Sequence, residues 1–309
     1  MGNLRALSLA TALLGSFGGA ALSADLPAPP GLPMAPAMAD PVEYNGWYLR
    51  GDVGIGKSGT PGLNYDLLRT GSVPSVAGGG YRDPGSFISQ DMQDQGLISF
   101  GAGYAWNNWL RTDATLEYRA KAQFNGIDQY VCHTTLIDAC YPNAVPAGYT
   151  INSQWRGNVS SMVAMANVYA DLGTWNNLTP YIGAGVGISR NTTTGISELG
   201  TVYTDPALKG GNYYMTDAQY SNGASKTNFA WALMTGLSYN VSQNLKLELG
   251  YRYINLGKAV TGYETQQPTS YQFVNLKTKS LTAQDFRLGM RWMLGTPTAT
   301  VDAPLVRKF

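Results

Sequence analysis

The sequence predicts an all-β protein: an eight-stranded antiparallel up-and-down transmembrane β-barrel with four long external loops and three short periplasmic turns. Three observations lead to this fold. Apolar and polar residues alternate with a period of two in eight segments, most segments exceed ten residues, and short and long connections alternate between them. Successive side chains of a strand point to opposite faces. A tilted strand needs about 9–11 residues to cross a bilayer, whereas strands of globular proteins have about five or six.

The chain begins with a predicted secretory signal peptide, residues 1–23. Arg5 precedes the apolar and small-residue run at 6–22, and small residues follow where a signal peptidase reads the chain. We expect cleavage after Ser23 or after Ala24. A permanent membrane anchor is the alternative, which the shortness and glycine content of the run disfavour. Residues 24–44 are rich in proline and alanine, which is typical of a semi-rigid linker, here in the periplasm.

The predicted barrel occupies residues 45–294, and no stretch within it reaches the ~18 apolar residues of a transmembrane helix. The eight predicted strands are 45–57, 94–106, 109–123, 156–172, 180–190, 227–240, 245–258 and 280–294. Short connections join three pairs of them, at 107–108, 173–179 and 241–244. The long connections are 58–93, 124–155, 191–226 and 259–279. Short periplasmic turns and long external loops are the plan of outer-membrane barrels.

Aromatic residues gather at the ends of the predicted strands, and several of them border the short turns. Tyrosine and tryptophan concentrate at membrane–water interfaces, where one edge of the ring is apolar and the other is wet. We therefore expect a periplasmic aromatic girdle, although aromatic residues could also close the end of a soluble barrel. The girdle residues are Trp47, Trp106, Trp109, Trp175, Tyr181, Tyr239 and Trp292.

The charged residues of the strands fall on one face. In 245–258, for example, Leu247 and Leu249 share one face, and Glu248 and Arg252 share the other. The two signs are nearly balanced, as an enclosed face requires, because a buried charge is costly unless it is paired. A soluble sandwich would instead expose this face to water. The predicted lumen network is Arg50, Asp52, Arg111, Asp113, Glu117, Arg119, Asp171, Lys246, Glu248, Arg252, Asp285, Arg287 and Arg291.

Small residues on three other strands leave space in the lumen for these long side chains. Such residues alternate in 94–106, 180–190 and 227–240. An eight-stranded barrel is just wide enough for side chains to fill it. Closure makes the first and last strands neighbours, so we expect Arg287 to pair with Asp52.

Composition and motifs give no indication of a cofactor or a metal. Charged residues make up 13% of the chain and the net charge is +1, which argues against nucleic-acid binding. The segment GAGVG (183–187) lacks the spacing of a dinucleotide-binding loop. His133 is the sole histidine, and no cluster of metal ligands accompanies it. Cys132 and Cys140 are expected to form a disulfide in an external loop, with two free thiols as the alternative.

The segments VYADLGTW (168–175), PYIGAGVG (180–187) and GYRYINLG (250–257), together with the signal peptide and ADLP (24–27), carry a resemblance. They are similar to the small outer-membrane β-barrel proteins of alphaproteobacteria, porin-family proteins within the broader OmpA/OmpX-like eight-stranded group. The resemblance implies a bacterial outer-membrane location, insertion by the barrel-assembly machinery, and contact with outer-membrane lipid and lipopolysaccharide. It implies surface-exposed loops but no common biochemical activity.

The C-terminus departs from that group, whose chains commonly end on an aromatic residue of the last strand. Here residues 295–309 follow the last predicted strand as a periplasmic tail, so either Trp292 or Phe309 serves as the assembly signal.

Three classes of function are compatible with the sequence. The first is a structural or surface-interaction barrel without catalysis, whose external loops contact an unidentified extracellular ligand. The second is a narrow porin-like channel, and the third is an outer-membrane lipid-modifying enzyme. Eight strands and a charge-bridged lumen argue against a wide aqueous pore.

Overall fold

The computed structural model describes residues 45–66, 86–131, 150–203, 215–262, 264–265, 272–273 and 275–294. Within these ranges, no helix is long and apolar enough to cross a membrane. The predicted signal peptide (1–23), linker (24–44) and tail (295–309) lie outside the described residues, as do Cys132, His133 and Cys140. These assignments therefore stay predictions.

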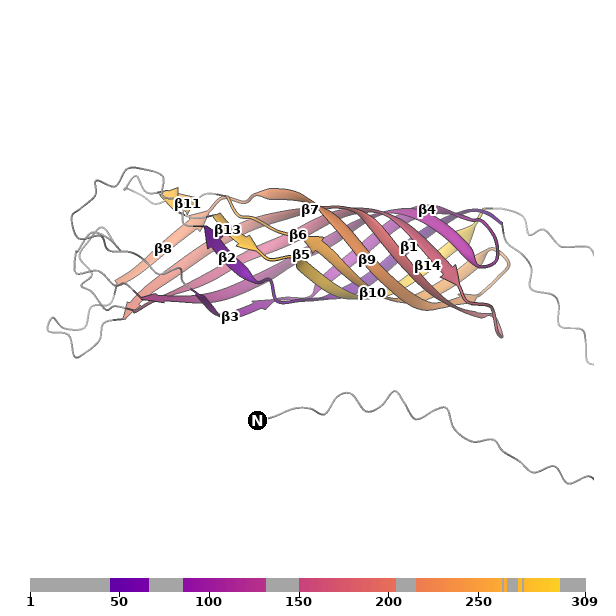
Figure 1. Cartoon of the computed structure of the whole chain (residues 1–309), viewed down its shortest axis with the longest axis horizontal. Helices are drawn as coiled ribbons and strands as arrows, with labels where there is room; N and C mark the ends of the chain where they lie inside the picture. The colour runs from indigo at the N-terminus through magenta and orange to yellow at the C-terminus, as the bar shows by residue number, and fades with distance from the viewer. Residues whose placement is uncertain are drawn as a thin grey trace, which may run out of the picture. The chain divides into compact units, whose positions relative to one another are not determined.

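Eight strands close into an antiparallel barrel (Figure 1), which confirms the predicted fold. Strand β1 pairs with β4 on one side and with β14 on the other, and β7 pairs with β9, so the ring has no open edge. The strands of the ring are β1 (Gly46–Ser58), β4 (Gln95–Ala105), β5 (Leu110–Val131), β6 (Thr150–Asp171), β7 (Leu178–Tyr203), β9 (Ser225–Asn240), β10 (Leu245–Gly257) and β14 (Leu281–Met293).

Three strands extend further than the sequence predicted. Strands β5, β6 and β7 have 22, 22 and 26 residues, so parts of the loops expected at 124–155 and 191–226 are strand. Their outer portions carry polar residues on the outward face, such as Gln123 and Asn158, so the alternation that marks a lipid-facing strand is lost there. Short strands lie at this external end: β2 (Leu63–Asp66), β3 (Ser86–Met92), β8 (Met215–Ser221), β11 (Glu264–Thr265), β12 (Gln272–Phe273) and β13 (Asn275–Thr278).

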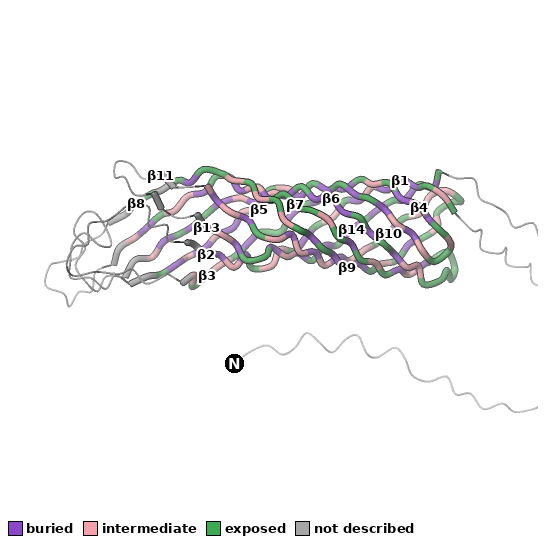
Figure 2. The backbone as a smooth tube through the Cα atoms, turned by 45° about the horizontal axis from the view of Figure 1, so that its top comes forward, coloured by how far each residue is buried: buried purple, intermediate pink, exposed green. Residues whose placement is uncertain are grey.

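The apolar face of the strands is the outer wall of the barrel. Leu49 and Leu288 are 50% and 58% exposed, whereas their neighbours Arg50 and Arg287 are each 7% exposed. Figure 2 shows this alternation of buried and exposed residues along the strands. An apolar surface that encircles the whole barrel requires lipid to cover it.

Glycines on the inner wall admit the large side chains of the lumen. A Cβ atom at Gly103 would overlap the ring of Tyr48, and one at Gly56 would overlap Arg119 and Asp285. Gly103, one of the small residues predicted for the lumen, therefore provides space for a partner on another strand, and Gly56 of β1, which was not predicted, does the same.

Candidate functional site

The candidate site is the interior of the barrel, because nearly all the charged residues predicted for the lumen are enclosed there. Strand register brings them together, since every second residue of all eight strands points inward. The buried members are Arg50, Asp52, Arg111, Asp113, Glu117, Arg119, Glu248, Arg252, Asp285, Arg287 and Arg291. Lys246 and Asp171 are partly buried at the periplasmic end.

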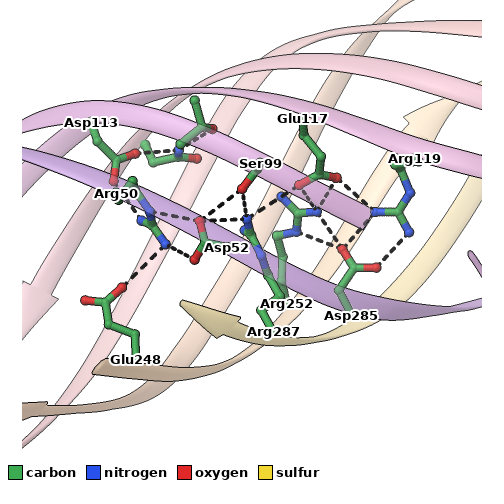
Figure 3. A network of polar contacts seen from close by, with 12 residues as sticks. Arg50, Asp52, Ser99, Asp113, Glu117, Arg119, Glu248, Arg252, Asp285 and Arg287 are labelled. Atoms are coloured by element: carbon green, nitrogen blue, oxygen red, sulfur yellow. Dashed lines mark hydrogen bonds and ion pairs between the residues drawn. The ribbon is translucent and has the colours of Figure 1, made fainter. Parts of the chain in front are cut away.

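Arg50 is the centre of one group of contacts (Figure 3). Its Nη2 lies 2.8 Å from Asp52 Oδ1 and 3.4 Å from Glu248 Oε2, and its Nη1 lies 2.7 Å from Asp113 Oδ2. Nη1 also donates a hydrogen bond to the hydroxyl of Tyr169 at 2.7 Å. Arg50 therefore links three carboxylates contributed by three different strands.

Asp285 is the centre of a second group, closer to the external end. Its Oδ1 and Oδ2 accept hydrogen bonds from both terminal nitrogens of Arg119, at 2.7 and 2.9 Å. Oδ2 also accepts hydrogen bonds from Arg252, at 2.6 and 2.9 Å. Both arginines contact Glu117 as well, at 3.1 Å for Arg119 and 2.6 Å for Arg252. Charge-assisted, two-pronged contacts of this kind are the strongest hydrogen bonds in proteins.

Arg287 connects the two groups. Its Nη2 donates a hydrogen bond to Ser99 Oγ at 2.6 Å and lies 3.2 Å from Asp52 Oδ2 and 3.6 Å from Glu117 Oε2. The pair expected between Arg287 and Asp52 is thus present. Asp52 is nevertheless held more closely by Arg50, on its own strand, at 2.8 Å.

A third group lies toward the periplasmic end, around Glu248. This carboxylate is 3.0 Å from Arg291 and 3.5 Å from Arg111, and Arg111 is 3.1 Å from Asp171. The Arg111 guanidinium also lies over the rings of Tyr169 and Tyr181, 4.1 and 4.8 Å from their centroids. Cation–π contact therefore supplements a set of ion pairs that is looser than the other two.

These contacts leave little free space at the level of the ion pairs. The cavity beside Arg50, Tyr181 and Glu248 has a volume of about 10 Å³ for the centre of a water molecule, which is room for about one water. In a region so poorly hydrated, each charge is stabilised by its partners rather than by solvent. At this level, therefore, the described side chains fill the lumen beside Arg50 and Glu248.

An apolar layer fills the interior on the external side of the ion pairs, and sequence reasoning missed it. Strands β2 and β13 pair with each other, and their Leu63 and Leu276 are 6% and 1% exposed. They belong to one buried cluster with Phe124, Trp155 and Ile196 of the long strands. The sequence contained a faint signal, because LNYD (63–66) and NLKT (275–278) each place one leucine in a polar stretch.

The aromatic residues predicted as a girdle divide into two sets. One set is exposed on the outer wall near the short turns: Trp47, Trp106, Trp109, Trp175, Tyr239 and Trp292. The assignment of Tyr181 to the girdle is wrong. Tyr181 is 5% exposed and packs inside the barrel against Tyr169, with their ring centroids 5.9 Å apart. Its position two residues before the inward-facing Gly183 places it on the lumen face.

A closed antiparallel barrel with an apolar outer wall and a charged, filled interior is a transmembrane β-barrel. The chain belongs to the family of outer membrane protein β-barrel domains, since the model of that family matches residues 11–293. It is therefore a protein of the bacterial outer membrane.

Two curated relatives and two solved structures illustrate the similarity. The chain is 34% identical over 227 residues to an uncharacterized protein of Brucella melitensis biotype 1, a match that covers 72% of each chain. It is 30% identical over 148 residues to outer membrane protein PagN of Salmonella typhimurium, which covers 47% of this chain and 54% of PagN. Neisserial surface protein A is 16% identical, with a TM-score of 0.39, and the match covers 81% of this chain and 98% of that one. OprG from Pseudomonas aeruginosa is 8% identical, with a TM-score of 0.40, and the match covers 81% and 97%.

Proposed function

We propose that this protein is a structural and surface-interaction barrel of the outer membrane, inserted by the barrel-assembly machinery, which makes its contacts through its external end and catalyses no reaction. The observation that carries this proposal is the filled interior. Ion pairs occupy the lumen at the level of the membrane, and the apolar layer around Phe124 and Leu276 occupies it on the external side. A solute would have to displace both.

The buried carboxylates support a structural role in preference to catalysis. Asp52, Glu117 and Asp285 are each engaged by at least two arginines, and each is 5% exposed or less. A catalytic acid must reach its substrate within hydrogen-bond distance. These acids instead link strands through arginines: Glu117 of β5 contacts Arg252 of β10 on the opposite side of the ring, and Asp52 of β1 contacts Arg287 of the neighbouring β14.

The long strands supply the surface for contact. The outer portions of β5, β6 and β7 pair with one another over their whole length, from Phe124–Gly157 outward on one side and from Asn158–Thr194 outward on the other. Many of their outward side chains are polar, such as Gln123, Gln154 and Thr192, although Leu199 is also 46% exposed. Figure 1 shows that these three strands extend beyond the rest of the ring. A rigid sheet is a precise support for a binding surface.

The test is a glycan and matrix-protein array probed with the refolded, labelled barrel. In the matched variant, an Asn-Gly turn replaces residues 193–224, because Thr192 and Ser225 are paired and a two-residue turn can join them. We expect the intact protein to bind at least one array component and the shortened barrel to lose that binding. Equal signals from the two proteins, or none from either, would overturn the proposed interaction role.

A further inference from the structure

The charges of the lumen are not balanced equally in all three groups of contacts. The groups around Arg50 and Asp285, with the connecting arginine, are neutral apart from Glu248, because four arginines face four acids: Arg50, Arg119, Arg252 and Arg287 face Asp52, Asp113, Glu117 and Asp285. The other charged residues predicted for the lumen lie toward the periplasmic end. They are three bases and two acids: Arg111, Lys246, Arg291, Asp171 and Glu248. We name these five residues the periplasmic charge group, which carries one positive charge in excess.

Strand register places like charges side by side in this part of the lumen. Arg291 of β14 pairs with Lys246 of β10 on one side and with Arg50 of β1 on the other. Like charges directly opposite on neighbouring strands destabilise a sheet. Glu248 is 3.0 Å from Arg291, 3.4 Å from Arg50 and 3.5 Å from Arg111. A single carboxylate is therefore shared by three guanidinium groups.

The guanidinium groups of the periplasmic charge group also have unused hydrogen-bond donors. Arg111 is 1% exposed, and neither its Nη1 nor its Nη2 has a hydrogen-bond acceptor among the residues that the structure describes. The same holds for Nε of Arg291. By contrast, all three nitrogens of the Arg119 guanidinium donate hydrogen bonds to oxygen atoms. The two tyrosine rings beside Arg111 are only weak acceptors.

These two observations point to the same missing partner. A buried charge is costly unless it is paired, and a buried donor is costly unless it is hydrogen-bonded. A water molecule would accept hydrogen bonds from Arg111 and Arg291 but would leave the excess charge. An anion would satisfy the donors and also neutralise the group.

The position of the group determines which anion can reach it. Asp171 accepts a contact from Arg111 and its side chain is 12% exposed, and its backbone N–H donates to the carbonyl of Trp109 at the edge of a short turn. Lys246 is also only partly buried. The periplasm therefore gives access to the group. The neighbouring cavity beside Tyr181 and Glu248 has room for about one water molecule, so the space favours an ion of a single atom.

We infer that the periplasmic charge group binds one chloride ion from the periplasm. The guanidinium of Arg111, Nε of Arg291 and the ammonium of Lys246 supply the positive charge and the hydrogen-bond donors. Chloride is a monovalent ion only slightly larger than a water molecule, and one such ion cancels the excess charge of the group. Binding does not open the barrel, since the ion pairs around Asp285 and the apolar layer lie on the external side of the site.

The experiment measures urea unfolding of the refolded full-length protein in phosphatidylcholine vesicles by tryptophan fluorescence. Sodium chloride replaces sodium gluconate stepwise at constant ionic strength, because gluconate has the same charge but is too large for the site. The test variant is Lys246→Gln, which removes the excess charge, and Lys246→Arg restores it. The control is Lys57→Gln, the same change at an exposed position on the outer wall. Heat-dependent gel mobility verifies that each protein is folded.

At a chloride concentration nine times the dissociation constant, we expect the folding equilibrium constant of the unmodified protein to be about tenfold higher than in gluconate alone. Lys246→Arg and Lys57→Gln should keep this dependence, whereas Lys246→Gln should change by less than about twofold over the same range. Equal stability of the unmodified protein in chloride and gluconate would overturn the inference. An equal chloride dependence of Lys246→Gln and the unmodified protein would do the same, because it would indicate a general salt effect.

A second measurement locates the ion independently of stability. Crystals of the unmodified protein grown in bromide should show an anomalous scattering peak between Arg111, Lys246 and Arg291, and crystals of Lys246→Gln should not. Peaks confined to the outer surface would indicate an adventitious ion only and would contradict the proposed site. If Lys246→Gln does not refold, the bromide peak and the chloride dependence of the unmodified protein, compared with Lys57→Gln and Lys246→Arg, decide the question.

Discussion

Asp285→Asn is the substitution that tests the interior network most sharply. Asp285 is fully buried and accepts hydrogen bonds from Arg119 and Arg252 through both oxygens. Asparagine has nearly the same volume and keeps one acceptor oxygen, so the substitution removes the charge without opening a cavity. Two buried guanidinium groups are then left with a single carboxylate, Glu117.

The cost follows from the loss of one member of a buried ion pair, which is about 3–5 kcal/mol. We expect the lower end, about 3 kcal/mol, because Glu117 and the remaining oxygen keep part of the stabilisation. With a urea dependence of about 2 kcal/mol per molar, the unfolding midpoint should fall by about 1.5 M.

The assay is urea unfolding of the barrel in lipid vesicles, followed by tryptophan fluorescence and by heat-dependent gel mobility. The control is Asp94→Asn, the same chemical change at an exposed position, which should shift the free energy of unfolding by no more than about 0.5 kcal/mol. If Asp285→Asn and Asp94→Asn have midpoints within 0.3 M of each other, a tolerance we set at about 0.6 kcal/mol, the interior is hydrated and the reasoning is wrong.

Three further predictions concern the outer wall, the apolar layer and the external loop. Leu288→Arg should destabilise the barrel by about 2–4 kcal/mol, and Gln284→Arg near the external border by about 0–1 kcal/mol; equal effects would contradict the placement of Leu288 in the middle of the lipid-facing band. Phe124→Ala should cost about 3–5 kcal/mol by the same urea assay, because it opens a cavity in the apolar layer; an unchanged midpoint would show that the layer is not packed. Alkylation of the unreduced, exported protein should label neither Cys132 nor Cys140; labelling of both would exclude the disulfide.

The sequence predicted the membrane part of the fold well because lipid imposes a strict rule on it. Every outward side chain at membrane depth must be apolar, so a strand such as β10 shows clear alternation between Leu247, Leu249 and the inward Glu248. Beyond the membrane this rule ends. Gln123 and Asn158 face water on strands whose inner faces are buried, and sequence alternation no longer separates strand from loop.

The sequence did not predict which charged residues pair with each other in the lumen, nor the apolar layer that fills the external end of the barrel. Arg119 and Asp285 are 166 positions apart in the chain and meet across the barrel, which depends on strand stagger rather than on adjacency. Closure of the barrel predicted only pairs between adjacent strands, such as Arg287 of β14 and Asp52 of β1. Leu63 and Leu276 lie in four-residue strands, too short to show a period. Two sequence rules gave opposite positions for Tyr181. As an aromatic residue at a strand end it was expected in the girdle, whereas the alternation along the strand placed it in the lumen. The structure shows that it packs in the lumen against Tyr169.

The central claim is that ion pairs and an apolar layer seal the barrel, and single-channel recording in planar bilayers tests it most directly. The refolded protein is inserted at high salt, and insertion is verified by protease protection of the barrel strands. The sealed interior predicts a flat current trace without unitary steps over the voltage range that the bilayer tolerates. Reproducible unitary steps from the unmodified protein would contradict the claim and identify the protein as a narrow channel.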